Sequence, residues 1–262
     1  MNRSKVARFA VLCVACAGAL AAVVLASPAV LPGSNACACT HGPTEPIWPV
    51  SVASARTVAE AFVSDPTSNL GATWLEPDGG RLYMVSDGAT WVAVDGGGAG
   101  VVAALYQNDM PTSSDGAMGA DGAETAATAF LGANSIALGG AAPTSARKTA
   151  GPVSYLEVSW IAAGGTIDVA VNAATGAVFW FFDGRHSRLA IPTPAIGYAA
   201  ARVLALAATP ASATPDDGWL NFSSSPTRFQ WFFGATTVTE SEKTTTELTV
   251  DPSSGQVAVA GQ

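Results

Sequence analysis

Histidine is scarce in this sequence, and recognisable catalytic motifs are absent. Only His41 and His186 occur among 262 residues, so a serine or cysteine nucleophile has almost no imidazole base to activate it. The sequence contains no HExxH, GxSxG or GxxxxGK(S/T) pattern, which mark metalloproteases, hydrolases and phosphate-binding loops. His186 lies in the polar stretch DGRHSR, where we expect a solvated loop. We therefore predict a protein that is not an enzyme and needs no cofactor.

Charge is also scarce. Charged residues make up 12% of the chain, against about 25% in typical globular domains. Twelve Lys and Arg and 20 Asp and Glu give a net charge of −8, and no basic cluster is larger than the pair Arg147 and Lys148. Because such a protein repels phosphate backbones, we do not expect nucleic acid as a partner. The hydrophobic content of 49%, broken up by 27 Gly and 16 Pro, favours short strands and turns.

Residues 1–36 have the layout of a secretory signal. A basic start precedes an uncharged run from Phe9 to Ala26. Possible signal-peptidase cleavage sites, marked by small residues, follow Ala29 and Ala36. The run is also just long enough for a membrane-spanning helix, so a cleaved signal peptide and an uncleaved membrane anchor both stay open. In either case the basic residues stay in the cytoplasm. We expect the remaining chain to be extracytoplasmic, either secreted or anchored by a single N-terminal helix.

The four cysteines carry no strong metal signature. Cys13 and Cys16 lie inside the apolar run and are interpreted as small apolar residues. Cys37, Cys39 and His41 are weak candidates for a metal site, because two thiolates and an imidazole at alternating positions could bind a soft cation. A fourth ligand is missing from this proline-rich linker. An extracytoplasmic location favours a disulfide instead, either local or between two copies of the chain.

One pattern occurs three times in the sequence. Valine precedes Asp or Asn, small and polar residues follow, and valine returns six positions later. The Asp or Asn positions are separated by 77 and 79 residues, which indicates one unit of roughly eighty residues used three times. The three stretches are Thr90 to Leu105, Ile167 to Phe182 and Thr246 to Gly261.

Each of these stretches follows residues with helical periodicity. We therefore predict an α+β fold of repeated units, each a helix followed by a 3–4-stranded antiparallel sheet, behind an N-terminal hydrophobic helix. The predicted helices are Val52 to Val63, Glu124 to Leu131 and Gly197 to Ala208. The predicted organisation is a signal peptide or anchor with its flank (1–36), a Pro-rich linker (37–50), unit 1 (51–108), a linker (109–122), unit 2 (123–186) and unit 3 (195–262).

The residues repeated within the pattern are those that tight turns require. Asp and Asn side chains close such turns by bonding to the nearby backbone, and Gly supplies a positive φ. We therefore interpret Asp95, Asn172, Gly176, Asp251 and Gly255 as structural turn residues and not as a binding site.

Large aromatic residues are concentrated in the last two units. In an extended strand, Phe179 and Phe181 would face one side, and Trp180 and Phe182 the other. We favour packing of these side chains between neighbouring units, with an exposed contact surface for a protein or a glycan as the alternative. The set comprises Trp160, Phe179, Trp180, Phe181, Phe182, Phe229, Trp231, Phe232 and Phe233.

The order of a helix, several strands and the motif V-x-V-(D/N)-x-x-(T/S)-G-x-V resembles the PepSY domain. The first unit departs from the motif, because Gly98 and Gly100 flank the expected glycine position. The resemblance implies an extracytoplasmic, non-catalytic domain, associated in that family with inhibiting or chaperoning peptidases. The matching residues are Val169, Val171, Asn172, Thr175, Gly176 and Val178 in the second unit, and Leu248, Val250, Asp251, Ser254, Gly255 and Val257 in the third.

Together these features predict a non-catalytic extracytoplasmic binding or regulatory protein that acts through protein contacts. The partner expected from the resemblance is a peptidase or another envelope protein, with the membrane as a further contact if the N-terminal segment is uncleaved. Two alternatives stay open. A carboxylate-dependent extracellular hydrolase needs two acidic side chains that converge in a pocket, and a metal-handling protein would use Cys37, Cys39 and His41.

Overall fold

The computed structural model describes most of the chain after residue 47. The residues predicted as a signal peptide or anchor lie outside the described part, as do Cys37, Cys39, His41 and residues 42–47 of the predicted linker. The described residues are 48–63, 71–75, 80–87, 89–150, 152–187, 191–209, 213–215, 219–224, 227–238 and 243–259.

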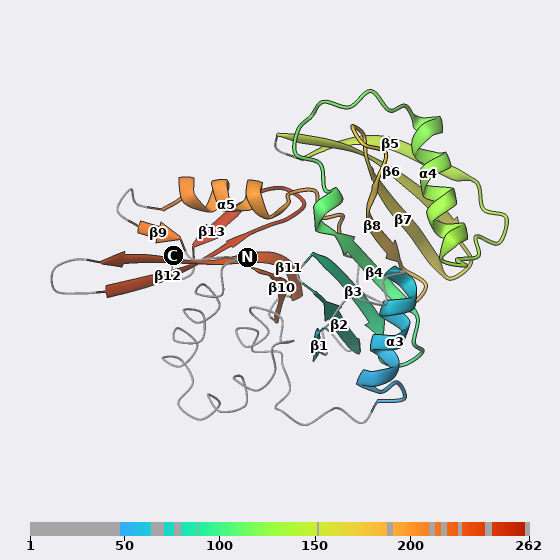
Figure 1. The fold of residues 1–262 in the computed structure, drawn as a ribbon, viewed down its shortest axis with the longest axis horizontal. Helices are drawn as coiled ribbons and strands as arrows, with labels where there is room; N and C mark the ends of the chain where they lie inside the picture. The colour runs from blue at the N-terminus through green and yellow to red at the C-terminus, as the bar shows by residue number, and fades with distance from the viewer. Residues whose placement is uncertain are drawn as a thin grey trace.

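The described chain consists of three segments, each of which begins with a helix and continues into antiparallel strands (Figure 1). The first segment contains α3 (Val52–Val63), β1 (Gly71–Leu75), β2 (Leu82–Ser86), β3 (Thr90–Asp95) and β4 (Val101–Tyr106), and a 3₁₀ helix, η2 (Gln107–Asp109), follows it. The second contains α4 (Ala120–Ala133), β5 (Pro143–Ala150), β6 (Val153–Ala162), β7 (Gly165–Asn172) and β8 (Val178–Asp183). The third contains α5 (Tyr198–Ala207), β9 (Ala213–Pro215), β10 (Trp219–Ser224), β11 (Thr227–Val238), β12 (Lys243–Val250) and β13 (Val257–Val259).

The first two segments share one sheet, whereas the third has its own. Strands β4 and β8 pair and join the two meanders into an eight-stranded antiparallel sheet in the order β1-β2-β3-β4-β8-β7-β6-β5. The third segment forms a five-stranded sheet in the order β10-β11-β12-β13, with β9 paired to β11. The α+β class predicted from the sequence is confirmed.

Several element boundaries differ from the sequence prediction. Helix α4 begins at Ala120, inside the predicted 109–122 linker and four residues before Glu124. Strand β5 was not predicted, because its sequence PTSARKTA is mostly exposed and lacks the apolar alternation of a half-buried strand. Strands β9 and β10 were missed as well.

The ends of the helices have recognisable local causes. Ser51 caps α3, since its Oγ accepts a hydrogen bond from the Ser54 N–H at 3.1 Å. After α4, Ser135 adopts φ 57°, while the Ser135 and Ile136 N–H groups bond to Gly132 O and Leu131 O. That pair of bonds is a Schellman closure, which normally favours glycine at the left-handed position.

The helices pack through small residues. Each presents two fully buried alanines, four positions apart, to a sheet, and this spacing places both on one face of a helix. The small side chains allow the helix backbone to approach the sheet closely. The pairs are Ala55 and Ala59 in α3, Ala123 and Ala127 in α4, and Ala201 and Ala205 in α5.

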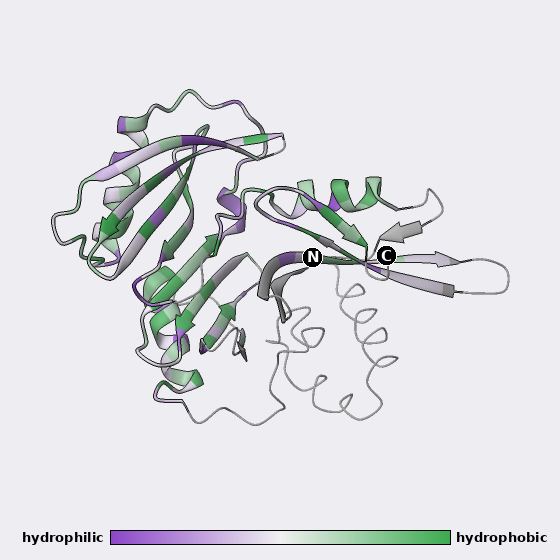
Figure 2. Cartoon of the chain, turned by 180° about the vertical axis from the view of Figure 1, so that it is seen from behind, coloured by the Kyte–Doolittle hydropathy of each residue, from purple (hydrophilic) through white to green (hydrophobic). Residues whose placement is uncertain are grey.

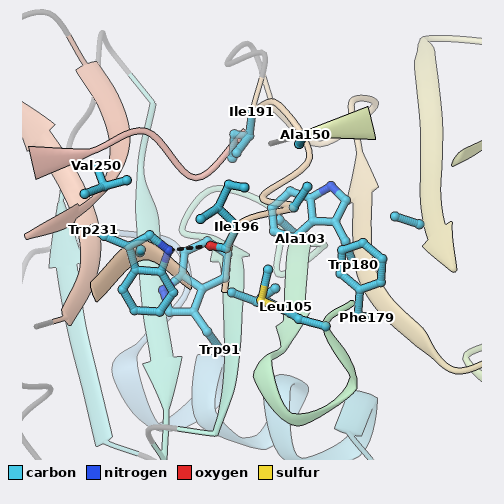
Figure 3. Close-up of a cluster of buried hydrophobic side chains, with 14 of the residues drawn as sticks. Trp91, Ala103, Leu105, Ala150, Phe179, Trp180, Ile191, Ile196, Trp231 and Val250 are labelled. Carbon is cyan, nitrogen blue, oxygen red and sulfur yellow. Dashed lines mark hydrogen bonds between the residues drawn. The ribbon is translucent and has the colours of Figure 1, made fainter. Parts of the chain in front are cut away.

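Two hydrophobic clusters cover the two faces of the eight-stranded sheet. One lies between the sheet and helices α3 and α4 and includes Phe62, Trp160 and Phe181. The other joins the opposite face to the third segment, where Trp91 and Trp180 lie near residues such as Trp231 (Figure 3). Of the aromatic residues singled out in the sequence, five are buried where the third segment meets the sheet, in agreement with the favoured interpretation: Phe179, Trp180, Phe182, Trp231 and Phe233. Phe181 contacts helices of both the first and the second segment, and Trp160 is buried in the cluster beneath α3 and α4.

One detail of the aromatic strand was predicted wrongly. Phe179 does not share a face with Phe181, because it lies in the cluster of Trp180 and the third segment. A β-bulge explains the change: Val171 pairs with Val178, but Ala170 pairs with Trp180, so Phe179 is an extra residue on β8.

None of the helices in the described part of the chain is long and apolar enough to cross a membrane.

Candidate functional site

The three predicted turns close with the same hydrogen bonds. The side-chain Oδ1 of Asp95, Asn172 and Asp251 accepts a bond from the backbone N–H two residues later, at 3.0, 3.0 and 2.8 Å. In each turn the backbone N–H of the Asp or Asn also donates to the carbonyl of the residue five positions later. The carbonyl of the Asp or Asn accepts a bond from the N–H of the residue four positions later. The side chains of Asp95, Asn172 and Asp251 are therefore bound into their own turns.

The third turn binds its carboxylate most extensively. Ser253 donates to Asp251 Oδ1 from both its backbone N–H and its hydroxyl, at 2.8 and 2.6 Å, and the Ser254 N–H adds a bond of 3.0 Å. Burial alone would raise the pKa of Asp251, but these hydrogen bonds outweigh burial and lower the pKa below its ordinary value. Asp251 is thus held ionised as part of the turn.

The left-handed position of these turns is filled differently in the first segment. Gly176 and Gly255 have φ of 80° and 76°, and Ala99 takes the equivalent position with φ 58°. The flanking Gly98 and Gly100 do not replace the missing glycine. The first turn therefore keeps the geometry of the other two, at the cost of an alanine in a conformation that L-residues disfavour.

Each turn is also tied to the start of its helix. The backbone N–H groups of Val50, Met118 and Ile196 donate to the carbonyl that follows the Asp or Asn of the turn, at 3.1, 3.2 and 2.7 Å. In the first segment, Tyr83 Oη donates to Val50 O at 2.7 Å and its ring contacts Trp48. Residues 48–50, predicted as the end of a spacer, are thus packed against the first segment.

The first two segments meet around an approximate twofold axis. Ala104 and Phe181, each nine residues after the Asp or Asn of its turn, pair directly with one another across β4 and β8. On the helix side of this junction, Phe62 of α3 and Phe130 of α4 meet with ring centroids 5.8 Å apart, and both contact Phe181. The junction is an interface between two segments of the same build.

A cleft of about 670 Å³ opens beside this junction, between α3, the β3–β4 turn and the loop after α4. Asp183, which is fully buried, lies in its wall and accepts bonds from Arg185 Nε and Nη2 at 2.8 and 2.6 Å. Arg185 Nη1 donates to Ala137 O at 2.8 Å. The hydrogen bonds to Asp183 raise the pKa of Arg185. This ion pair ties β8 to the loop after α4, so both its charges are occupied.

His186 also borders the cleft. Its side chain is 43% exposed, and Nε2 lies 3.8 Å from Asp183 Oδ2. A Cβ on Gly100 would lie 2.6 Å from the imidazole ring, so the ring rests directly on the first turn. The expected solvated loop residue is thus half-packed, because the β4–β8 pairing brings the first turn beside the end of β8. One imidazole beside a carboxylate that is already paired with Arg185 does not form a nucleophile–base pair.

Two carboxylates come near each other on the opposite face of the sheet. Glu157 contacts Lys148 Nζ at 3.4 Å and accepts a bond from Thr193 Oγ1 at 2.8 Å. Burial raises the pKa of Asp168. A hydrogen bond from Ser159 lowers this pKa in part, and the nearby charge of Glu157 raises it further. Burial and then Glu157 also raise the pKa of Tyr155 to about 12. Through Thr193, this polar group holds the linker to the third segment against the sheet.

Helix α5 contains a single charged residue and is drawn mostly in the hydrophobic colour (Figure 2). The large apolar side chains that are exposed among the described residues are Ile161, Val203 and Leu206, and two of these lie on α5. Val203 is 64% and Leu206 37% exposed. Apolar residues all round a helix are typical of one that is covered on every side. The outward residues at matching positions, counted from the buried alanines, are Thr57, Thr125 and Val203, and Glu60, Thr128 and Leu206.

Sequence reasoning missed both the Asp183–Arg185 pair and the α5 surface. The first carries no sequence signal, because its role depends on the β4–β8 pairing. The second could have been found by aligning the three predicted helices, since GYAAARVLALAA contains a single charged residue. Within the described ranges, no group of three His, Cys, Asp or Glu side chains comes together to hold a metal ion.

Comparison of the sequence with protein-family models and with curated proteins finds no match. Among solved structures, the chain is similar to the Bacillus megaterium YpeB C-terminal domain, with 14% identity and a TM-score of 0.38 over 81% of this chain and 99% of that chain. Similarity at this level does not establish a shared family or a shared function.

Proposed function

We propose that the chain contains three copies of one PepSY-like unit and is a non-catalytic extracytoplasmic binding or regulatory protein. It acts through contacts with another protein, and the partner class is a peptidase or another envelope protein. The repeat is supported by the equal turn bonds, by the equal tie between turn and helix, and by the buried alanine pairs. The N-terminal segment secretes the chain or anchors it to the membrane.

The observation that carries this proposal is the exposed apolar surface of α5. Val203 and Leu206 stand where α3 and α4 have threonine or glutamate, although all three helices pack on their sheets in the same way. Exposed apolar groups gain free energy when a partner removes them from water, about 25 cal/mol for each Å² of apolar area. A partner that covers α5 would bury Val203 and Leu206, which the described part of the chain leaves exposed.

The test is capture of an envelope partner with the full chain as bait. A charge buried in an apolar contact is costly, so Val203→Glu should reduce recovery of the partner at least about tenfold, equivalent to 1.4 kcal/mol. Thr125→Glu, at the matching position of α4, is the control and should recover as much partner as the wild type. Recovery of no specific partner, or equal recovery with both variants, contradicts the proposal.

The hydrolase alternative has a specific candidate place among the described residues. Glu157 and Asp168 are close enough to influence each other, but Glu157 is engaged by Lys148 and Thr193. If these carboxylates catalyse hydrolysis, Asp168→Asn should abolish activity on glycoside or peptide substrates. If they serve only to hold the linker, purified wild type and variant should be equally inactive.

The metal-handling alternative depends on residues outside the described part of the chain. It predicts that wild-type protein carries more bound metal than Cys37→Ser, measured by elemental analysis of the purified chain. Equal metal content in the two proteins would dispose of this alternative.

A further inference from the structure

Strand β13 occupies the same place in the third segment as β4 and β8 in the first two. All three follow the Asp or Asn turn and end their meanders. Strands β4 and β8 are paired with each other, whereas β13 pairs with β12 on one side and, within the described residues, has no strand on the other. In the described part of the chain, the third segment therefore has no counterpart of the strand pairing that joins the first two.

Among its described residues, the β13 edge carries none of the side-chain or bulge features that protect sheet edges against pairing, and only its short length limits pairing. Natural sheets protect exposed edges with short strands, charges, prolines and bulges. Edge strand β5 of the large sheet has a proline, Pro143, and two exposed charged residues, Arg147 and Lys148. Strand β13 has the sequence VAV, and its register with β12 is continuous, without the bulge found in β4 and β8.

The register shows which backbone groups face the open edge. The Asp251 N–H donates to Gln256 O at 2.9 Å, so these residues form a hydrogen-bonded pair. In an antiparallel ladder such pairs alternate with non-bonded ones. Ala258 therefore bonds toward β12, while the N–H and C=O groups of Val257 and Val259 point outward.

We propose that a second copy of this chain covers the β13 edge. Strand β13 of one copy pairs antiparallel with β13 of the other, around a twofold axis, as β4 pairs with β8 inside the chain. The argument rests on an interface already present: two segments of this build meet through their last strands, with equivalent residues opposite one another. A twofold interface uses the same surface on both copies, and β13 offers such a surface. It is distinct from the outward face of α5.

The dimer is expected to be weak and concentration-dependent. The contact strand is short, and each copy has a net charge of −8. The repulsion between the copies is screened by salt, with a Debye length of about 8 Å at 0.15 M. The interaction should therefore strengthen as the salt concentration rises.

The first test is sedimentation of the full chain over a concentration series, with reductant present so that cysteine cross-links do not contribute. The wild type should move from monomer toward dimer mass. Val259→Pro removes an outward N–H without removing a bond to β12, and should raise the dissociation constant at least about tenfold. A monomer mass at every concentration overturns the proposal.

The matched control is Thr149→Pro on the β5 edge. The N–H of Ser154, its partner in the ladder, points away to Ser113 O, so Thr149 also faces outward at an edge. This variant should dimerise like the wild type. If Val259→Pro and Thr149→Pro weaken the dimer equally, or if Val259→Pro does not weaken it, the proposal that the dimer forms through the β13 edge is wrong.

The second test needs no substitution. Amide hydrogen exchange of Val257 and Val259 should be slower in concentrated than in dilute wild-type protein, while exchange of the Thr149 amide should be the same in both. Equal exchange of the β13 amides at the two concentrations would refute the pairing. Loss of the α5 partner in the capture experiment would leave both results unaffected, so the two proposals fail separately.

Discussion

The first two segments and the third share their local structure but use it differently. All three have the same turn, the same bond from turn to helix and the same buried alanine pair. The first two bury their last strands against each other, whereas the third packs through Trp231 and the preceding linker on the open face of their sheet. The comparison shows that the turn motif specifies the build of a segment, while strand and helix surfaces decide how segments assemble.

The largest expected effect comes from the junction of the third segment. Trp231 is buried, and its Nε1 donates to Ile196 O at 2.7 Å (Figure 3). Trp231→Ala should lower the free energy of unfolding by about 3–5 kcal/mol, because it removes a buried ring and leaves a cavity. Urea unfolding measures this change.

Trp231→Phe separates packing from hydrogen bonding at this site. It keeps most of the ring but leaves Ile196 O without its donor, which should cost about 1–3 kcal/mol. Hydrogen exchange should then show faster opening of β11 and β12 than of β6 and β7. If the amides of β6 and β7 exchange as fast as those of β11 and β12 in Trp231→Ala, the third segment does not unfold separately from the first two. That result would contradict the difference drawn between the third segment and the first two.

The sequence was sufficient for the build of each segment because that build depends on short-range signals. Alternation, helical periodicity and the Asp or Asn turn are each read from one short stretch of sequence, and they located α3, β3, β4, β7 and β8 closely. Strand β5 was missed because its exposed edge position requires no apolar pattern. The left-handed Ala99 was missed because no sequence rule predicts an alanine there.

The candidate sites could not be predicted for a different reason. Asp183 and Arg185 pair locally, two residues apart, but the first turn reaches His186 at the end of β8 only because β4 pairs with β8. That pairing joins strands far apart in the sequence and depends on complementary surfaces, not on a local motif. The bulge that redirects Phe179 has the same origin.

The next largest effect tests whether the turns are equivalent. Gly176 has φ 80°, and a Cβ there would lie 2.9 Å from Met118 Cε. Gly176→Val, with a β-branched side chain at a left-handed position, should lower stability by about 2 kcal/mol or more. Chemical unfolding measures the loss, and unchanged stability would show that the turn relaxes.

Ala99→Gly is the complementary change in the first segment. It relieves an alanine at φ 58°, although the more flexible unfolded chain offsets about 0.4–1 kcal/mol of the gain. Stability should therefore stay the same or rise by up to about 1 kcal/mol. A clear loss would mean that Ala99 contributes packing that Gly176 and Gly255 do not.

The smallest effect distinguishes the third turn from the second by its charge. Because the pKa of Asp251 is lowered in the folded protein, the ionised side chain stabilises folding above its unfolded pKa, near 3.8, and this contribution is lost as the pH falls through the folded pKa. Asp251→Asn keeps the side-chain oxygen, as Asn172 does in the second turn, but removes the titration. Its stability deficit should therefore shrink on going from about pH 6 to about pH 3.

Asp168→Asn is the control of opposite sign. Burial raises the pKa of Asp168, so the wild type is favoured by the protonated side chain and loses that advantage as the pH rises through the folded pKa. The stability of Asp168→Asn relative to the wild type should thus be highest at neutral pH, whereas the relative stability of Asp251→Asn should be highest in acid. Urea midpoints at the two pH values measure both, and parallel changes in the two variants would mean that the acid response comes from elsewhere in the chain.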